Sequence, residues 1–368
     1  MKIKIVIGIC LLWIFFPMYV CAQETLIEQF EFGEVEQVVD ELFPSEKMSF
    51  TEFLTSITNG ESNEVWKNLG KYFWQQLTFE LQNAKHSFIQ ILVIAIVAAV
   101  FHNFSGIFQN QHVAELSFYV VYMLLISICL NMMKILIDSV SAGVENLLKF
   151  FQALGPVYFM GVAITTGSAT SIAFYNVLLF AIYLVENLVT KILLPLVQAY
   201  VVIRILNDLS KEEYLSKFGD LVEMLTKWIL RMLLAGVLGM NVIQGMLMPA
   251  IDAVKRKAIL GGTEAIPFIG DAAGGITEVV LGTAVLIRNG VGAAGVIICL
   301  AICIVPTVRM AIIVLLYRVT AAIIQPISEK RIVNCVGNMA NGANLLLQTI
   351  LTTCVLFLIT IAIVANHG

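Results

Sequence analysis

The side chains best able to do chemistry in this sequence are ionisable and amide groups that interrupt long apolar runs. Glu186 and Asn187 stand next to each other in one such run, and Arg288 and Asn289 adjoin another. Transferring such groups into lipid costs free energy, so in a membrane protein they mark a solute path or a buried contact between subunits. For Glu186, a position at the membrane surface beside Lys191 is an equally good interpretation.

Three arginines, Arg204, Arg231 and Arg309, lie near the ends of apolar runs. A long side chain can bury its methylenes beside lipid while its charged end reaches the headgroups. We therefore interpret these arginines as residues that extend to the membrane surface, in preference to a polar lining.

No catalytic or cofactor-binding motif is present in the sequence. It contains no Gly-x-x-x-x-Gly-Lys-Ser/Thr phosphate loop, no His-Glu-x-x-His, no Cys-x-x-Cys and no Gly-x-Ser-x-Gly. Cys299 and Cys303 share a helix face, and we interpret them as small apolar packing residues. We therefore expect no enzymatic activity, no cofactor and no metal. An ATP-driven role would need a separate ATPase subunit, and no polybasic run suggests nucleic acid.

Apolar runs of 15–22 residues dominate the chain after residue 87. The residues are 59% hydrophobic and 13% charged, with a mean hydropathy of +0.89, whereas a soluble domain has about 25% charged residues. We predict an all-α fold, a polytopic transmembrane helical bundle over residues 87–368, with about seven to nine spans, because ~20 apolar helical residues cross a bilayer. The runs are Phe88–Phe104, Leu116–Ile137, Ala173–Thr190, Trp228–Met248, Val291–Val305, Met310–Ile324 and Leu346–Val364.

The N-terminus has the composition of an export signal. In residues 1–22, Lys2 and Lys4 precede an apolar stretch and the small-residue site Val20–Ala22, so we predict a signal peptide there. An uncleaved first transmembrane helix is the alternative. Residues 23–86 would then form a small exported region, which is acidic: twelve acidic and four basic residues lie between Gln23 and Lys85.

Apolar spacing in this exported region predicts three amphipathic helices. The first ends before Pro44, the second opens with the capping box Ser49–Glu52, and the third covers Val65–Leu81. Their apolar stripes would form either a docking surface for another exported protein or a cap buried on itself or on the membrane face.

Two segments within the apolar part of the chain are rich in small residues. Gly155–Ser171 surrounds Pro156 with Gly, Ala, Ser and Thr, and residues 249–295 hold nine glycines after Lys255–Lys257. Small residues let helices approach closely or break, so we expect re-entrant or pore-proximal elements; an amphipathic hairpin on the membrane surface is the alternative for residues 249–295. The positive-inside rule favours a re-entrant segment at Gly155–Ser171, which enters the membrane and returns to the same side. The candidate conduit or packing residues are Gly155, Pro156, Gly167, Glu186, Gly282, Arg288, Asn289, Gly292 and Gly295.

A faint internal repeat aligns Lys191–Leu225 with Arg309–Ala343 at an offset of 118 residues. Each copy would be a span followed by an amphipathic surface helix. Repeats of this kind occur in secondary transporters. A self-contained secondary transporter of a small solute is therefore an alternative function.

Three features together resemble one known family. They are the exported acidic head, the small-residue segment Gly155-Pro156-Val157-Tyr158-Phe159, and the run from Leu286 to Ile298. On these residues the whole chain resembles the stage III sporulation protein AE family of endospore-forming bacteria. The resemblance supplies no catalytic residues.

The resemblance implies a location and a set of partners. The protein would be a non-enzymatic subunit in the mother-cell membrane around the developing forespore. It would belong to a channel or secretion complex that joins the two cells and is needed for late forespore development. Its partners would be membrane lipid and other stage III sporulation subunits, including a cytoplasmic ATPase and ring-forming proteins between the two membranes.

Overall fold

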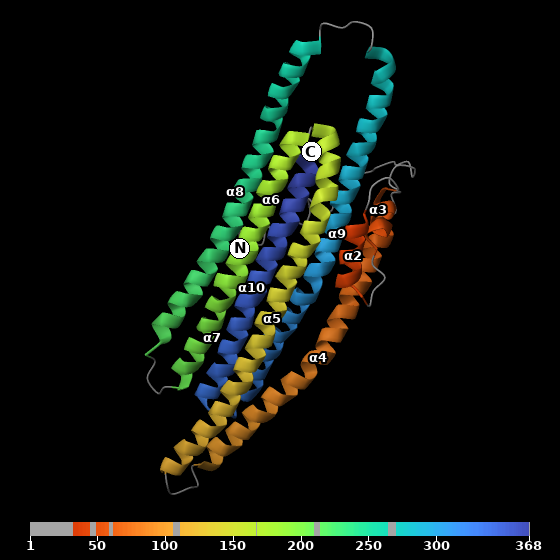
Figure 1. The fold of residues 1–368 in the computed structure, drawn as a ribbon. Helices are drawn as coiled ribbons and strands as arrows, with labels where there is room; N and C mark the ends of the chain where they lie inside the picture. The colour runs from red at the N-terminus through yellow and green to blue at the C-terminus, as the bar shows by residue number, and fades with distance from the viewer. Residues whose placement is uncertain are drawn as a thin grey trace.

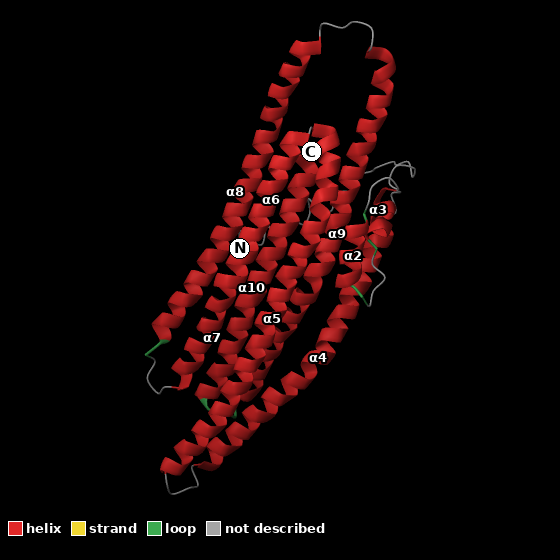
Figure 2. Ribbon diagram, in the orientation of Figure 1, coloured by secondary structure: helices red, strands yellow, loops and turns green. Residues whose placement is uncertain are grey.

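The computed structural model describes residues 32–44, 49–58, 62–105, 111–166, 168–209, 214–263 and 270–367. The signal peptide predicted for residues 1–22 lies outside these ranges. Within them every regular element is a helix and no strand occurs (Figure 2). The predicted all-α fold class is therefore confirmed.

The helices form one elongated bundle in which chain direction alternates from one long helix to the next (Figure 1). Their bounds are α2 Gly33–Leu42, α3 Phe50–Thr58, α4 Ser62–Ser105, α5 Gln111–Thr166, α6 Ser168–Leu188, the π-helix η2 Val189–Leu193, α7 Leu194–Leu209, α8 Ser216–Thr263, α9 Gly270–Ile324 and α10 Lys330–His367.

Several of these helices are far longer than one membrane crossing. α5 has 56 residues and α9 has 55, so each is more than about 80 Å long, against a hydrocarbon core of ~30 Å. In the described residues four helical stretches are long and apolar enough to cross a membrane: Tyr119–Met160, Tyr175–Leu209, Asn289–Ile324 and Lys330–Ile361. This is a membrane protein whose helices extend well beyond one bilayer thickness.

The sequence divided α5 into separate pieces, and that division is wrong. Leu116–Ile137 and the described part of Gly155–Ser171, up to Thr166, both belong to this one helix. The polar residues between them do not form turns. Lys134, Asp138, Glu145 and Lys149 recur at spacings of four, seven and four residues, so they share one helix face that is largely exposed.

Helix α10 packs against α5, α7, α8 and α9, and its buried side chains contribute much of the core. Phe357 of α10 meets Phe151 of α5 edge to face, with ring centroids 4.8 Å apart. Leu346 and Ile350 are fully buried. Helix α4 runs along the side of the bundle and packs against α5 and α9 (Figure 1).

The two segments rich in small residues are helical wherever the structure describes them. α5 passes through Gly155 and Pro156 without interruption, and α9 passes through Gly292 and Gly295. Gly167 and residues 264–269 lie outside the described residues. Whether Gly155–Ser171 or residues 249–295 dip into a bilayer stays a prediction.

One helix does change its winding, and a proline explains it. The π-helix η2 directly precedes α7, whose second residue is Pro195. Proline has no N–H, and its ring clashes with the carbonyl four residues earlier in an α-helix. A single π-turn relieves this conflict, and α6, η2 and α7 continue as one rod.

The three amphipathic helices predicted before residue 86 begin as expected, but the third continues into the apolar run as α4. The backbone N–H of Glu52 donates to Ser49 Oγ at 3.2 Å, as the capping box predicted. α2 packs against α5, and α3 packs against α9. Their apolar stripes are thus buried against the bundle, which favours the cap interpretation for these faces.

Candidate functional site

A buried ion pair joins α4 to the centre of the bundle. Arg309 of α9 donates from Nε to both carboxylate oxygens of Glu80 at 3.0 and 3.1 Å, and its Nη2 lies 3.0 Å from Glu80 Oε1. Arg309 Nη1 also donates to Ser139 Oγ of α5 at 3.1 Å. We call Glu80, Ser139 and Arg309 the α4 clamp. It connects three helices at one level.

The two charges of this clamp are unequally buried. The Glu80 side chain is 5% exposed and that of Arg309 is 32% exposed. A buried carboxylate needs a charged or hydrogen-bonding partner, because its desolvation is costly. Arg309 supplies that partner, so the predicted extension of Arg309 to the membrane surface is wrong. The sequence did hold a signal for Glu80: this acid shares the buried side of α4 with Leu69 and Ala84.

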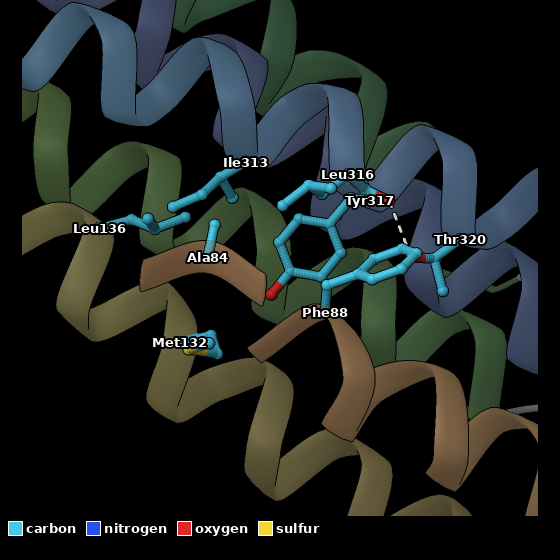
Figure 3. Close-up of a pocket in the computed structure, with 8 residues that line it drawn as sticks. All are labelled: Ala84, Phe88, Met132, Leu136, Ile313, Leu316, Tyr317 and Thr320. Carbon is cyan, nitrogen blue, oxygen red and sulfur yellow. Dashed lines mark hydrogen bonds between the residues drawn. The ribbon is translucent and has the colours of Figure 1, made fainter. Parts of the chain in front are cut away.

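A pocket of about 50 Å³ lies between α4, α5 and α9 (Figure 3). Ala84, Leu136 and Ile313 line it, and each lies one helical turn from a residue of the α4 clamp. The Tyr317 hydroxyl is buried there, with no hydrogen-bond partner among the side chains that the structure describes. Small-molecule sites usually enclose roughly 300 Å³ or more, so this pocket is too small to be a solute path.

A second charged contact fastens α7 to α8 close to the turn between them. Arg204 Nη2 donates to Asp220 Oδ1 at 2.6 Å and lies 3.6 Å from Glu223 Oε2. The guanidinium also lies 5.3 Å from the ring centre of Tyr200. The hydrogen bond from Arg204 holds the pKa of Asp220 below its ordinary value. Arg204 is therefore paired with acidic residues of α8. Its predicted extension to the headgroups stays a prediction.

The end of α7 is also bonded to α10 and α5. Asn338 Nδ2 of α10 donates to Asp208 Oδ2 at 2.6 Å. The Tyr122 hydroxyl of α5 donates to the Ile205 carbonyl at 3.4 Å. Asn207 Oδ1 accepts the backbone N–H of Leu215 at 2.9 Å. These bonds satisfy polar groups that would otherwise be buried without partners.

The predicted glycines lie at close helix contacts where the structure describes them. A Cβ on Gly155 would come within 2.6 Å of the Tyr175 ring of α6, and one on Gly295 within 2.7 Å of Leu154 of α5. Gly292 is buried in α9. Only hydrogen fits at Gly155 and Gly295 without a shift of the neighbour, so both allow helices to approach closely.

The other predicted site residues do not converge on one place. Glu186 is half-buried one turn before η2, and its carboxylate accepts from Asn187 Nδ2 at 3.3 Å. Pro156 is exposed on α5, and Asn289 is half-buried at the start of the apolar part of α9. Gly282 and Arg288 lie on α9, and their surroundings are outside the described side chains.

Taken together, the polar contacts of the described residues connect one helix to another. The residues that the structure describes include no group of three or more His, Cys, Asp or Glu that could hold a metal ion. The five cysteines among them are buried and reduced. What the arrangement can do is fix the relative positions of α4, α5, α7, α8, α9 and α10.

Comparison with known proteins adds a family to this geometry. The family model described as Stage III sporulation protein AE matches residues 48–368. The chain is 22% identical over 327 residues to the Stage III sporulation protein AE of Bacillus subtilis (strain 168), covering 88% of this chain and 80% of that protein. No solved structure matches the chain.

Proposed function

Because the chain belongs to the stage III sporulation protein AE family, we propose that it is a non-enzymatic multi-pass membrane subunit of a sporulation-specific transenvelope channel or secretion complex. The complex would link the mother cell with the forespore and be required for late forespore development. The chain would lie in the mother-cell membrane around the forespore. The family match over residues 48–368 carries this proposal.

Within the proposed complex, the described bundle fits a platform better than a pore lining. Glu80 pairs with Arg309, and Arg204 pairs with Asp220. Such internal pairs hold helices in place and leave few charges to line a path. The length of α5 and α9, more than about 80 Å each, also gives the subunit rigid parts outside the bilayer that partners can contact.

The proposal requires separate partners. The sequence has no phosphate-binding loop, so energy for transport would come from a cytoplasmic ATPase subunit. Ring-forming proteins between the two membranes would continue the conduit. Isolation of the tagged full chain from sporulating cells, followed by identification of co-purifying proteins, tests this directly. An unrelated multi-pass protein carrying the same tag is the control.

The expected result is co-purification of other stage III sporulation subunits with the chain and not with the control. Recovery of the chain alone, in a detergent that keeps other membrane complexes of the same cells intact, would contradict the proposal.

A self-contained secondary transporter is the second candidate, and one observation favours it. Both aligned segments, Lys191–Leu225 and Arg309–Ala343, contain the end of one helix and the start of the next: α7 ends at Leu209 and α8 starts at Ser216, and α9 ends at Ile324 and α10 starts at Lys330. At the offset of 118 residues the two helix ends differ by three positions and the two helix starts by four. Solute flux by the purified chain alone in liposomes, reduced by Glu186→Gln, would support this candidate over the first.

A further inference from the structure

Helix α5 carries a polar stripe along the face that points away from the bundle. Its members recur at spacings of three, four and seven residues, which places them on one side of a helix. Five of the six are exposed and Lys149 is half-buried. From first to last they extend along about 32 Å of helix. We call these six residues the α5 stripe: Asn131, Lys134, Asp138, Glu145, Lys149 and Gln152.

The four charges of the α5 stripe are not used to hold the bundle together. Lys149 Nζ lies 3.3 Å from Glu145 Oε1, one turn away on the same helix. In the part of the chain that the structure describes, none of the four charged side chains is bonded to another helix. The opposite face of α5, with Met133, Val140 and Leu147, is buried in the core. The charges therefore depend on whatever lies outside the bundle.

The α5 stripe lies beside the apolar spans of two other helices. A Cβ on Gly143, in the middle of the stripe's length, would come within 3.1 Å of Pro306 of α9 and 3.5 Å of Ile350 of α10. Both neighbours belong to stretches that are long and apolar enough to cross a membrane, Asn289–Ile324 and Lys330–Ile361. The stripe is thus level with these spans and does not extend beyond their ends.

A neighbouring side of the bundle is apolar at the same level. A Cβ on Gly155 of α5 would touch Tyr175 of α6, and the two helices run in opposite directions (Figure 1). Tyr183, eight residues further along α6, is therefore level with about residue 147 of α5. Tyr183 is 58% exposed and Phe180 is 63% exposed, and residues 168–185 contain no Asp, Glu, Lys or Arg. At one level the chain thus has a side suited to lipid and a side that is charged.

Neither lipid nor a second α5 stripe suits the charged side. Charged side chains in membrane spans are costly against hydrocarbon, and they face water or protein instead. Two copies in one membrane share a common depth, so a two-fold contact between their stripes would place Lys134 opposite Lys134 and Asp138 opposite Asp138. Like charges in contact repel each other and disfavour such a pairing. Water satisfies all four charges without this cost.

We propose that the α5 stripe borders water at the level of the spans and forms one wall of an aqueous passage beside the bundle. The passage lies outside the packed core, which agrees with the internal ion pairs of the α4 clamp and of Arg204. Two lysines and two carboxylates cancel in net charge, so this wall suits hydrophilic solutes of either sign. As the wall of a passage, the stripe deepens the proposed channel function and rests on it.

Thiol labelling of the full-length chain tests the proposal. Asn131→Cys, Ala142→Cys and Gln152→Cys place a thiol on the outward face of α5 without changing any charge. Phe180→Cys and Tyr183→Cys are the matched controls on α6. Membranes of sporulating cells, opened by freeze–thaw, are treated with a negatively charged thiosulfonate that does not enter lipid. We expect the three α5 thiols to react at least about tenfold faster than the two α6 thiols, because the reactive thiolate forms in water.

Two controls make the labelling rates comparable. The described native cysteines are buried and should not react, and Cys10 and Cys21 are replaced by serine in every variant. After denaturation in detergent, all five introduced thiols should react equally, which shows that each thiol was present and reduced.

Two results would overturn the proposal. If the α5 thiols react as slowly as those on α6, lipid or another chain covers the stripe. If the α6 thiols react as fast as those on α5, this level of the bundle lies wholly in water and no passage is needed. Partners that co-purify with a chain whose α5 thiols are unreactive would leave the channel proposal standing and remove this one.

Discussion

Arg309 and Glu80 are 229 positions apart in the sequence, yet the guanidinium of one holds both oxygens of the other. The contact connects the N-terminal half of α4, which the sequence assigned to an exported region, with the middle of a helix that the sequence assigned to the membrane. The N-terminal region and the membrane bundle are therefore one packed unit over the described residues.

The unequal burial of this pair predicts unequal effects of removing either partner. Arg309→Ala leaves the Glu80 carboxylate buried and unpaired, which should lower the free energy of unfolding by about 3–5 kcal/mol. Glu80→Ala should have a smaller effect, because the Arg309 side chain is 32% exposed and can reach a more polar surrounding. Thermal unfolding of the detergent-purified variants measures both.

The double variant Glu80→Leu, Arg309→Met is the control for this prediction. It removes both charges and keeps the volume apolar, so it should recover much of the stability lost in Arg309→Ala. Equal losses from the two single alanine variants would argue against the burial asymmetry.

Gly155 is predicted to be intolerant of any larger residue. Gly155→Ala places a methyl group against the Tyr175 ring, which must shift, so the expected loss of stability is about 1–3 kcal/mol. Gly236→Ala is a matched control: no atom lies within 4 Å of a Cβ there. Because alanine favours a helix interior over glycine, the control should be neutral or stabilising by up to about 1 kcal/mol. Similar losses in both variants would contradict a close α5–α6 contact at Gly155.

A hydrogen bond to a buried carboxylate helps to hold α7 against α10. Asn338→Leu removes the donor to Asp208, which is only 9% exposed. The expected loss is about 1–3 kcal/mol, because a charged acceptor then loses a partner. Asn341→Leu, which alters an exposed asparagine on α10, is the control. Protease sensitivity of the α7–α8 turn should rise in Asn338→Leu alone, and an unchanged digestion pattern would count against the bond.

The Arg204–Asp220 pair predicts a specific dependence on pH. The folded pKa of Asp220 is lowered by its hydrogen bond from Arg204. The pair therefore stabilises the fold above the unfolded pKa of about 3.9, and this contribution is lost as the pH falls through the lowered folded value. The difference in unfolding midpoint between wild type and Asp220→Asn should be constant near neutral pH. It should shrink towards zero below about pH 4.

Asp138→Asn is the control for that profile, since Asp138 is exposed and forms no ion pair with the described residues. Its unfolding midpoint should follow that of wild type throughout. If the unfolding midpoints of wild type and Asp220→Asn still differ at low pH, the difference does not come from the ionised Asp220 carboxylate.

Part of the fold could be predicted from local pattern. The capping box at Ser49 and the stop before Pro44 gave correct ends for α2 and α3, because both depend on residues within a few positions. The extent of α5 could not be predicted in this way, because the helix continues through Gly155 and Pro156 and ends at Thr166, inside the small-residue segment Gly155–Ser171. Gly and Pro permit a break but do not require one, and in α5 the contact with Tyr175 and the surrounding bundle keep the helix continuous.

The candidate site residues were also predicted only in part. Glycine content pointed to Gly155 and Gly295, since small residues are the sequence signature of close helix contacts. Glu80 was not selected, and Arg204 and Arg309 were assigned to the membrane surface. Their partners lie on other helices, up to 229 positions away, and a single sequence does not pair residues at such separations.

The sequence by itself determined that this chain is helical, that it has runs long and apolar enough to cross a membrane, and that it has no catalytic motif. These properties follow from composition, apolar run length and spacing along the chain, all of which are local. Only the tertiary structure decided that the apolar runs merge into helices of more than about 80 Å, that two of the arginines are internal partners, and that α2 and α3 bury their stripes on α5 and α9. Helix length and side-chain pairing depend on which helix faces meet. A polar residue can remain inside a long helix when a neighbouring helix or solvent satisfies its side chain.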